Sequence, residues 1–333
     1  MIEHIEIDTF VKFLGDNTGG VSRPVQVIGS NGKEYLLKNQ NVYNTDTRSW
    51  ETWDCMFLQE ALVHNIARHM GITLPDFAVA NVERIFLQNA PALTFEHRYV
   101  PGYHFASSLI EGVENNLRDG YQELIALGKP YIKRSWTTFF NNIANREDVA
   151  KIIVLDLLTA NFDRFGNLGN LIIASNNGER LMYCIDHGHC FYGAQWASVT
   201  KKRMMLHVSP DIAYINEYSN FLLQSSNAPM SGLGEIFRAL DSYIDVSEND
   251  NHCFHDIVLH VEDITPDLID NWFHGIPDEW YVDKVNQIAQ YKYFIMNQKN
   301  LLRVFLDVLA HNKAFHSHLG GNLGWNVGLT GTP

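Results

Sequence analysis

No stretch of this 333-residue chain comes near 18 consecutive apolar residues, so the sequence predicts no membrane-spanning helix. The opening residues, MIEHIEIDTF, carry acids where a signal peptide would have a basic segment, and no long apolar run follows them. Cysteine is scarce, because only Cys55, Cys184, Cys190 and Cys253 occur, and their spacing matches no disulfide framework. These absences together predict a protein of the reducing cytoplasm.

Basic residues are also few. Lys and Arg together number 25, against 38 Asp and Glu, which gives a net charge of -13 at pH 7. A field of this sign repels nucleic acid, so we do not expect direct nucleic-acid binding. The chain has no internal repeat and no low-complexity segment. Its length and its 46% hydrophobic content allow a large core, in one domain or in two lobes.

The most informative part of the chain is the stretch 158–191, LTANFDRFGNLGNLIIASNNGERLMYCIDHGHCF. It carries three polar groups, Asp163, Asn170 and Asp186, and each lies at the edge of an apolar run. Asp and Asn are also the ordinary residues of loops, so such a series can arise without a site. The sequence around these three residues therefore has to show whether they form a site or are ordinary loop residues.

This surrounding sequence predicts a β-hairpin. Two alternating apolar runs flank Asn177-Gly178, which is a strong two-residue turn signal. The hairpin would place Asn170, where its first strand begins, beside Asp186, where its second strand ends. An acid, an amide and a second acid at one end of a hairpin suit a hard divalent cation such as Mg²⁺, which often shares such ligands with phosphates.

A glycine-bearing segment lies near the start of the chain, at 15–24. Its glycines free the backbone, so that N–H groups could face a phosphate, although a plain turn has the same composition. The segment does not match the GxxxxGK[ST] phosphate loop. Two strands, 24–29 and 34–38, should follow it, joined by a turn at Asn31-Gly32.

Lys38 ends the second of these strands, and a helix is predicted over 53–70. Glu60 lies in the middle of that helix among apolar residues. The acid could pair with Lys38 and hold it over nucleotide phosphates. Alternatively, both side chains are solvated, which is the usual state of a lysine at a strand end.

The remaining segments predict an α+β fold. Residues 2–13, 72–86 and 92–99 are expected as strands, and Pro101-Gly102 as a hinge. An N-lobe would then cover 1–100, a helical C-lobe 101–315 and a flexible tail 316–333. Residues 192–230 are expected to be irregular. The helices expected in the C-lobe span 105–117, 121–127, 135–143, 148–160, 233–244 and 282–312, with short helices opening at Thr265-Pro266 and at Pro277.

In this order, the pieces resemble a protein-kinase-like fold, and more narrowly the HipA-like kinases. The resemblance covers roughly residues 20–310 and rests on TANFDRFGNLGNLII, IDHGHCF, GKEYLLKN, LQEALVHNIARHMGITLP and GIPDEWY. The first two motifs are specific, whereas the lysine and glutamate motifs are weak one at a time. The resemblance implies two lobes, with a β-rich N-lobe and a mostly helical C-lobe.

The resemblance also implies roles in the C-lobe. Asp163 resembles the catalytic-loop acid that orients a substrate hydroxyl and accepts its proton. Asn170 resembles the asparagine that binds Mg²⁺, and Asp186 resembles the main metal-binding acid, with His187-Gly188 where many kinases have Phe-Gly.

In the N-lobe, Lys38 resembles the lysine that contacts the α- and β-phosphates, and Glu60 resembles its helical partner. Gly19, Gly20 and Ser22 resemble the phosphate-covering loop, although they depart from GxGxxG.

Three positions stay open. Kinases usually place the asparagine five residues after the acid, whereas Asn170 is seven after Asp163 and Asn167 is four after it, so Asn167 is the alternative metal ligand. Arg164 could stabilise charge on the transferred phosphoryl group or could simply anchor the loop. By its position between the predicted lobes, the segment Phe95–Tyr99 is the candidate for holding the adenine.

The implied activity is ATP- and Mg²⁺-dependent phosphoryl transfer to a protein Ser or Thr, with an antitoxin or another regulatory protein as a possible partner. Thr18 and Ser22 are candidate sites of self-modification. A small-molecule kinase and a nucleotide-binding module without transfer are the alternatives. A metal hydrolase using His187, His189 and Cys190 is a further one, although this spacing fits no standard zinc site.

Overall fold

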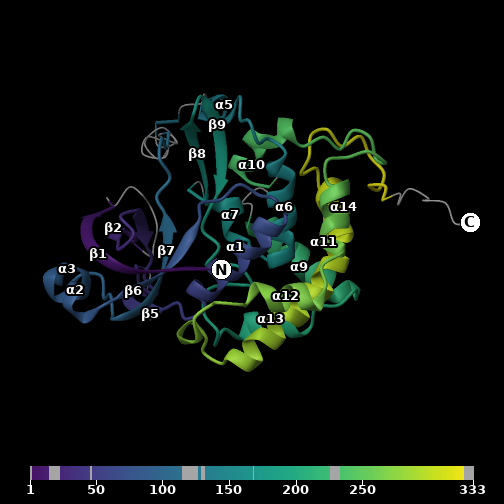
Figure 1. Cartoon of the computed structure of the whole chain (residues 1–333). Helices are drawn as coiled ribbons and strands as arrows, with labels where there is room; N and C mark the ends of the chain where they lie inside the picture. Colours follow the sequence, from purple (N-terminus) through teal and green to yellow (C-terminus); the bar gives the residue numbers. More distant parts are fainter. Residues whose placement is uncertain are drawn as a thin grey trace, which may run out of the picture.

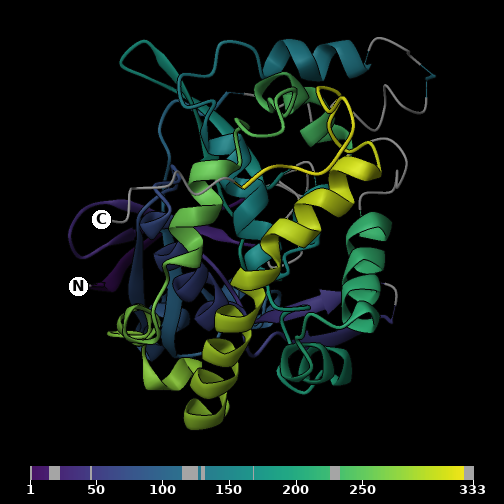
Figure 2. The ribbon, with the colours of Figure 1, turned by 90° about the vertical axis from the view of Figure 1, so that its right-hand side faces the viewer.

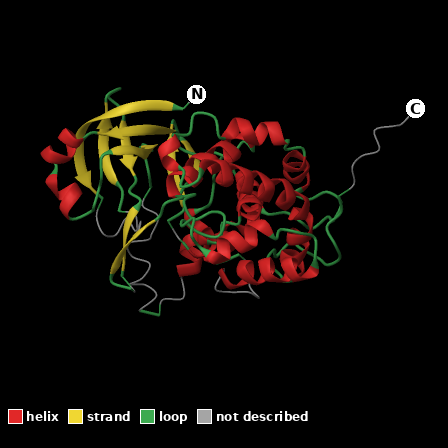
Figure 3. Ribbon diagram, turned by 90° about the horizontal axis from the view of Figure 1, so that it is seen from below, coloured by secondary structure: helices red, strands yellow, loops and turns green. Residues whose placement is uncertain are grey.

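The structure is a computed structural model that describes residues 2–14, 23–45, 47–114, 127–128, 132–167, 169–225 and 233–325. It has a mixed α+β architecture, with a β-rich N-terminal region and a helical C-terminal region (Figures 1 and 3). No helix in the described part of the chain is long and apolar enough to cross a membrane. All four cysteines are free thiols, in agreement with the absence of a disulfide framework in the sequence.

Five strands of the N-terminal region close into a barrel in the order β1-β2-β3-β7-β6. They are β1 (Glu3–Phe13), β2 (Val25–Gly29), β3 (Glu34–Leu37), β6 (Phe77–Val82) and β7 (Gly102–Ser108). Alternation sets their faces, because Val25 and Val27 pair with Leu37 and Tyr35, and all four side chains are buried inside. The predicted hairpin turn at Asn31-Gly32 is present, with a φ of +77° at Gly32. A separate ribbon, β4 (Asn41–Asn44) and β5 (Ser49–Thr52), follows the barrel strand β3.

Two predictions in this region are wrong. Residues 92–99 form no strand, because helices α2 (Arg84–Asn89) and α3 (Pro91–Phe95) follow β6, and Pro91 occupies the first position of α3. Of the predicted helix 105–117, residues 105–108 belong to β7, a barrel strand that pairs with both β3 and β6, and residues 109–114 are not helical, whereas 115–117 lie outside the described ranges. A short apolar run alone does not distinguish a helix from a strand. In 102–108, the hydrogen bonds to the neighbouring strands β3 and β6 stabilise the strand.

The C-terminal region contains the predicted hairpin. Strands β8 (Leu171–Asn176) and β9 (Glu179–Cys184) pair antiparallel, and Asn177 and Gly178 form the turn with φ values of +51° and +85°. The apolar helix α6 (Asp148–Thr159) leads toward it and ends at Ala160 in a left-handed conformation, before the single turn of α7 (Asp163–Gly166).

Residues 192–230 were expected to be irregular, but they include α8 (Val199–Leu206) and α9 (Ile212–Ser225).

The predicted helix 121–127 stays a prediction, because residues 121–126 lie outside the described ranges. The other helices are α5 (Ile132–Phe139), α10 (Glu235–Leu240), α11 (His255–Glu262), α12 (Pro266–Trp272), α13 (Lys284–Gln298) and α14 (Leu302–His311), with short 3-10 turns η2 (Asp241–Tyr243), η3 (Asp278–Trp280) and η4 (Lys299–Leu301). Helix α12 begins as predicted, because Thr265 accepts a hydrogen bond from the Leu268 N–H and Pro266 is its first residue.

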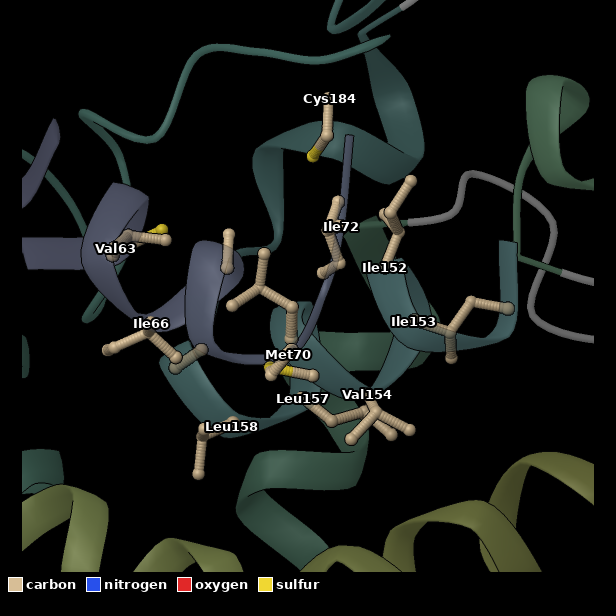
Figure 4. Close-up of a cluster of buried hydrophobic side chains, with 14 of the residues drawn as sticks. Val63, Ile66, Met70, Ile72, Ile152, Ile153, Val154, Leu157, Leu158 and Cys184 are labelled. Carbon is tan, nitrogen blue, oxygen red and sulfur yellow. The ribbon is translucent and has the colours of Figure 1, made fainter. Parts of the chain in front are cut away.

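The main core lies between α1 (Met56–His69) and α6. Met70, next to α1, lies beside the α6 side chains Leu157 and Val154, and Val63 and Ile66 of α1 belong to the same buried cluster (Figure 4). Helices α13 and α14 follow one another along one side of the molecule and contact α6 (Figure 2). This core fixes α1, which carries Glu60, against the segment that leads into Asp163.

A matched pair of substitutions tests this core. Val154 is fully buried in α6, whereas Val285 is 79% exposed in α13. Because both valines are helical, Ala gives both sites the same gain in helix propensity. Val154→Ala should lower the free energy of unfolding by roughly 2–3 kcal/mol relative to Val285→Ala, through lost burial and a residual cavity. Urea unfolding measures the difference, and equal midpoints for the two variants would contradict this packing.

Candidate active site

Lys38 follows β3 directly, and its N–H still bonds the Phe105 carbonyl of β7. Its Nζ lies 2.5 Å from Glu60 Oε1 and 3.0 Å from Asp186 Oδ1. The expected pairing of Lys38 with Glu60 is therefore present. The same ammonium also bridges to the acid after β9, so that one cation joins the barrel, helix α1 and the hairpin end.

Burial and charge oppose one another in this cluster. Burial alone would lower the pKa of Lys38, but the carboxylates of Asp186 and Glu60 raise it above its usual range, so the ammonium persists. For Asp186, burial alone would raise the pKa, but the positive charge of Lys38 holds this pKa well below its usual range. Burial raises the pKa of Glu60, Lys38 opposes this shift, and the negative charge of Asp186 adds to it. The Glu60 side chain is 2% exposed, whereas that of Asp186 is 32% exposed. Asp186 is thus the ionised acid that can reach a ligand.

A second group of polar side chains surrounds Asp163, the first residue of α7. Asp163 Oδ2 accepts hydrogen bonds from Asn170 Nδ2 at 2.9 Å and from Asn167 Nδ2 at 3.4 Å. Asn161 Oδ1 in turn accepts a bond from the Asp163 N–H at 3.3 Å. The hairpin therefore brings Asn170 to Asp163, and the Asn170 carbonyl also accepts the Ile185 N–H, one residue before Asp186.

The two candidate asparagine ligands differ in their amide oxygens. Asn167 Oδ1 already accepts the Gly169 N–H at 3.1 Å, which stabilises the local turn. For the Asn170 amide oxygen, the described residues supply no hydrogen-bond donor. A metal ion binds an amide through its oxygen, so the geometry favours Asn170 over Asn167.

Arg164 is buried, and all three nitrogens of its guanidinium group have partners within hydrogen-bond distance. Its Nε lies 2.8 Å from Asp156 Oδ2, and its NH1 donates to the carbonyls of Asn170 at 2.9 Å and Ile185 at 2.7 Å. Its NH2 lies 3.2 Å from His187 Nδ1. Of the two roles considered from the sequence, this arrangement favours the anchoring of the loop over contact with a phosphoryl group.

The sequence reasoning missed Asp156 and Asn161. Asp156 lies in the fully buried face of α6 and pairs with Arg164, and Asn161 Nδ2 donates to Asp156 Oδ1 at 3.1 Å. Burial raises the pKa of Asp156 to about 6 even though Arg164 opposes it. A lone acid inside the otherwise apolar run VLDLL was the signal for a buried ion pair.

The chain passes from the barrel to the helical region at 109–114, and Phe95–Tyr99 do not form this connection. The Gly112 carbonyl accepts the Ser175 N–H at 3.0 Å, and the Glu114 N–H donates to the Ile173 carbonyl at 2.9 Å, so the segment runs beside β8. A Cβ at Gly112 would lie 2.4 Å from the Ser175 carbonyl oxygen, and its φ of +68° also favours glycine.

Phe95 is instead 83% exposed on α3, and the buried Tyr99 donates its hydroxyl to the Leu37 carbonyl. The loop residues Gly19, Gly20 and Ser22, like Thr18, lie outside the described residues.

The arrangement does not favour the zinc-hydrolase alternative. His187 Nδ1 faces the Arg164 guanidinium, and burial raises the pKa of the Cys190 thiol well above its usual range. The His189 ring packs edge-on against Trp53 at 4.4 Å. Within the described ranges, no group of three or more His, Cys, Asp or Glu side chains is arranged to hold a metal. The side-chain oxygens of Asp186 and Asn170 could instead hold a cation that completes its shell with phosphate and water.

The role of Arg164 can be tested through stability. Arg164→Met would leave the buried Asp156 carboxylate without its cation, and we expect a loss of about 3–5 kcal/mol of unfolding free energy. Arg146→Met, at an exposed arginine, should change stability by less than about 0.5 kcal/mol. Denaturant unfolding of both variants measures this. An Arg164→Met protein of normal stability would show that Arg164 does not anchor the loop.

No protein-family model and no curated protein matches this chain. Among solved structures, the chain is similar to the Helicobacter pylori proinflammatory kinase CtkA, at 16% identity over 96% of this chain and 100% of that chain, with a TM-score of 0.49. It is also similar to HipA of Shewanella oneidensis MR-1, solved as a toxin–antitoxin system with HipB and its operator DNA, at 13% identity over 86% of this chain and 65% of HipA, with a TM-score of 0.42. The HipA-like kinases that the sequence motifs resemble are therefore represented among the structures similar to this chain.

Proposed function

We propose that this protein transfers the γ-phosphoryl group of ATP to a hydroxyl group, with Mg²⁺, on a two-lobed protein-kinase-like fold. One observation carries the proposal. A single ammonium, that of Lys38, bridges Glu60 and the ionised Asp186, while Asp163 and Asn170 are hydrogen-bonded at the same hairpin end. Structural ion pairs alone do not require a catalytic-loop acid beside them, whereas phosphoryl transfer uses each of these groups.

The sequence predicts lobes at 1–100 and 101–315 with a hinge at Pro101-Gly102 and a tail at 316–333, but β7 (Gly102–Ser108) belongs to the barrel, so the N-lobe would extend to about residue 108. Because β7 belongs to the barrel, we place the connection between the lobes at 109–114 and propose that its backbone, rather than Phe95–Tyr99, faces the adenine. Lys38, held by Glu60, would contact the α- and β-phosphates. Gly19, Gly20 and Ser22 would cover the phosphates with backbone N–H groups.

The donor set fits Mg²⁺, because Asp186 supplies an ionised carboxylate and Asn170 an amide oxygen. When bound, the ion draws negative charge from the phosphate oxygens. Lys38 fixes the direction of the Asp186 carboxylate, and the Arg164 contacts to the carbonyls of Asn170 and Ile185 fix the backbone beside both ligands. Asn167 is the alternative ligand.

Asp163 would receive the proton of the attacking hydroxyl. As the acceptor oxygen bonds to the γ-phosphorus, the bond from that phosphorus to the bridging oxygen breaks and ADP leaves. Asp163 accepts hydrogen bonds from two asparagine amides, so its carboxylate is held in place before the acceptor arrives. The site would then act through positioning and electrostatics rather than through a covalent intermediate.

The acceptor proposed is a Ser or Thr of a protein, and this rests on the motif resemblance to HipA-like kinases. On the same basis we propose self-modification at Thr18 or Ser22 and a regulatory protein partner such as an antitoxin. Cysteine usage supports a cytoplasmic protein. Asp163, Asn170 and Asp186 are all present, which favours phosphoryl transfer over a nucleotide-binding module that does not transfer phosphate.

Loss of either acid tests the transfer. Asp163→Ala and Asp186→Ala should each lower phosphate transfer from γ-labelled ATP by about 10²-fold or more, an order of magnitude typical of electrostatic site mutations. Asp76→Ala, at a side chain that is 81% exposed, is the control and should keep the wild-type rate. Near-full transfer by either site variant would refute these assignments. Nucleotide binding without transfer in the wild type would indicate a binding module or a missing acceptor.

Self-modification is tested separately. After incubation with ATP and Mg²⁺, mass spectrometry should find phosphate within residues 15–24, at Thr18 or Ser22, and chelation of the metal with EDTA should prevent it. The Asp163→Ala protein should remain unmodified under the same conditions. Phosphate found only outside 15–24 would contradict the assignment of this loop.

A further inference from the structure

A strained turn lies a few residues after Asp186. Three consecutive residues have left-handed backbone conformations, with φ values of +55° at Phe191, +64° at Tyr192 and +114° at Gly193, and Asp186 itself has a φ of +63°. For Phe and Tyr this region is unfavourable, and it persists only where the surroundings fix it.

Two buried side chains hold the Gly193 carbonyl. Lys201 Nζ, from α8, donates to it at 2.8 Å, and Gln59 Nε2, from α1, donates to it at 3.2 Å. The Gln59 Nε2 also donates to the Gly188 carbonyl at 2.6 Å, two residues after Asp186. At the start of the turn, the Phe191 N–H donates to the Thr159 carbonyl at 2.6 Å. Both ends of the turn are thus tied to neighbouring helices.

Lys201 is the centre of this network. Its ammonium is fully buried, lies 5.6 Å from the centre of the Tyr291 ring and also donates to Gln59 Oε1, which accepts the Tyr291 hydroxyl at 2.9 Å. In the part of the chain that the structure describes, no carboxylate lies within ion-pair distance of Lys201. A buried cation without a carboxylate partner is unfavourable for folding. Stability alone therefore does not account for a lysine at this position.

The groups facing Lys201 explain its charge state. Burial lowers its pKa to about 8, and the Cys55 and Cys190 thiols and the Asp54 carboxylate oppose this shift. Lys201 is therefore still mostly protonated at pH 7. Because the pKa is lower in the folded state than in the unfolded state, the Lys201 charge destabilises the fold, and its contribution to stability rises between about pH 8 and the ordinary lysine pKa. A substitution that removes this charge at neutral pH should therefore not weaken folding.

The network reaches the candidate active site through α1. Gln59 precedes Glu60, which holds Lys38. Gly188 packs so closely on α1 that a Cβ there would lie 2.6 Å from Met56 Cγ and 3.2 Å from Glu60 Oε1. The segment from Asp186 to Gly193 and helix α1 therefore behave as one packed unit, held at one end by Lys38 and at the other by Lys201.

We propose that Lys201 is a positioning residue for phosphoryl transfer, which fixes the strained turn Phe191–Gly193 through Gln59 and thereby aims the Asp186 carboxylate at its metal ion. This inference rests on the proposed function, because the metal-binding role of Asp186 belongs to it. Lys201 itself would touch neither nucleotide nor metal.

The test compares Lys201→Met, which keeps the aliphatic stem, with Lys202→Met at the exposed neighbouring lysine. In Lys201→Met, the Mg²⁺ concentration for half-maximal transfer should rise about 10- to 100-fold, as for other residues that orient metal ligands. The KM for ATP at saturating Mg²⁺ and the melting temperature should stay near the wild-type values. Lys202→Met should match the wild type throughout.

Hydrogen exchange gives a readout that needs no activity. Amides of residues 187–193 should exchange faster in Lys201→Met, while those of the hairpin 171–184 should not. If Lys201→Met fails to fold, Tyr291→Phe removes one bond to Gln59 and should show a smaller change of the same kind. Unchanged exchange and Mg²⁺ dependence would overturn the proposal, as would a loss confined to the melting temperature. If the wild type transfers no phosphate, the proposed function fails, and the exchange comparison alone decides whether Lys201 holds the turn.

Discussion

The ammonium of Lys38, shared between Glu60 and Asp186, is the interaction on which the rest of the site depends. It joins a barrel strand, a core helix and the end of a hairpin, three segments that are far apart in the sequence. Since neither carboxylate has another cation at ion-pair distance among the described residues, a displaced lysine would leave two buried or half-buried acids facing each other. Repulsion between such acids would alter both pKa values and the position of α1.

Two further buried cations, Arg164 and Lys201, hold the segments that carry this cluster. Arg164 ties α6 to the backbone on both sides of the hairpin end, and Lys201 ties the following turn to α1. Arg164 donates to the carbonyls of Asn170 and Ile185, and Lys201 donates to that of Gly193, so each cation adds a charged hydrogen bond to the backbone of this region. Asp186, Phe191 and Tyr192 have strained backbone conformations, and charged hydrogen bonds from Lys38, Arg164 and Lys201 hold the segments next to them. Such fixed geometry would hold the Asp186 carboxylate in position before a metal ion binds.

The sequence predicted the parts of the site that depend on local patterns. The turn at Asn177-Gly178 predicted the hairpin, and with it the approach of Asn170 to Asp186. Helical spacing placed Glu60 within a helix, but its pairing with Lys38 stayed one of two interpretations, which the structure decides. The sequence-based prediction failed where distant partners decide, as for the strand 102–108, whose two neighbours in the barrel override its local pattern. The ion pair of Arg164 with Asp156 was also missed, because the lone acid in the apolar run VLDLL indicates a buried partner but not which residue supplies it.

The most direct test is a double-mutant cycle on the single-turnover rate of phosphoryl transfer, using Lys38→Met, Glu60→Gln and the double variant. If the two side chains act as one unit with Asp186, each single variant should lose about 10²-fold and the double variant should lose little more. Losses that simply multiply would contradict a shared cluster. Rates that stay near the wild-type value in all three variants would contradict phosphoryl transfer at this site.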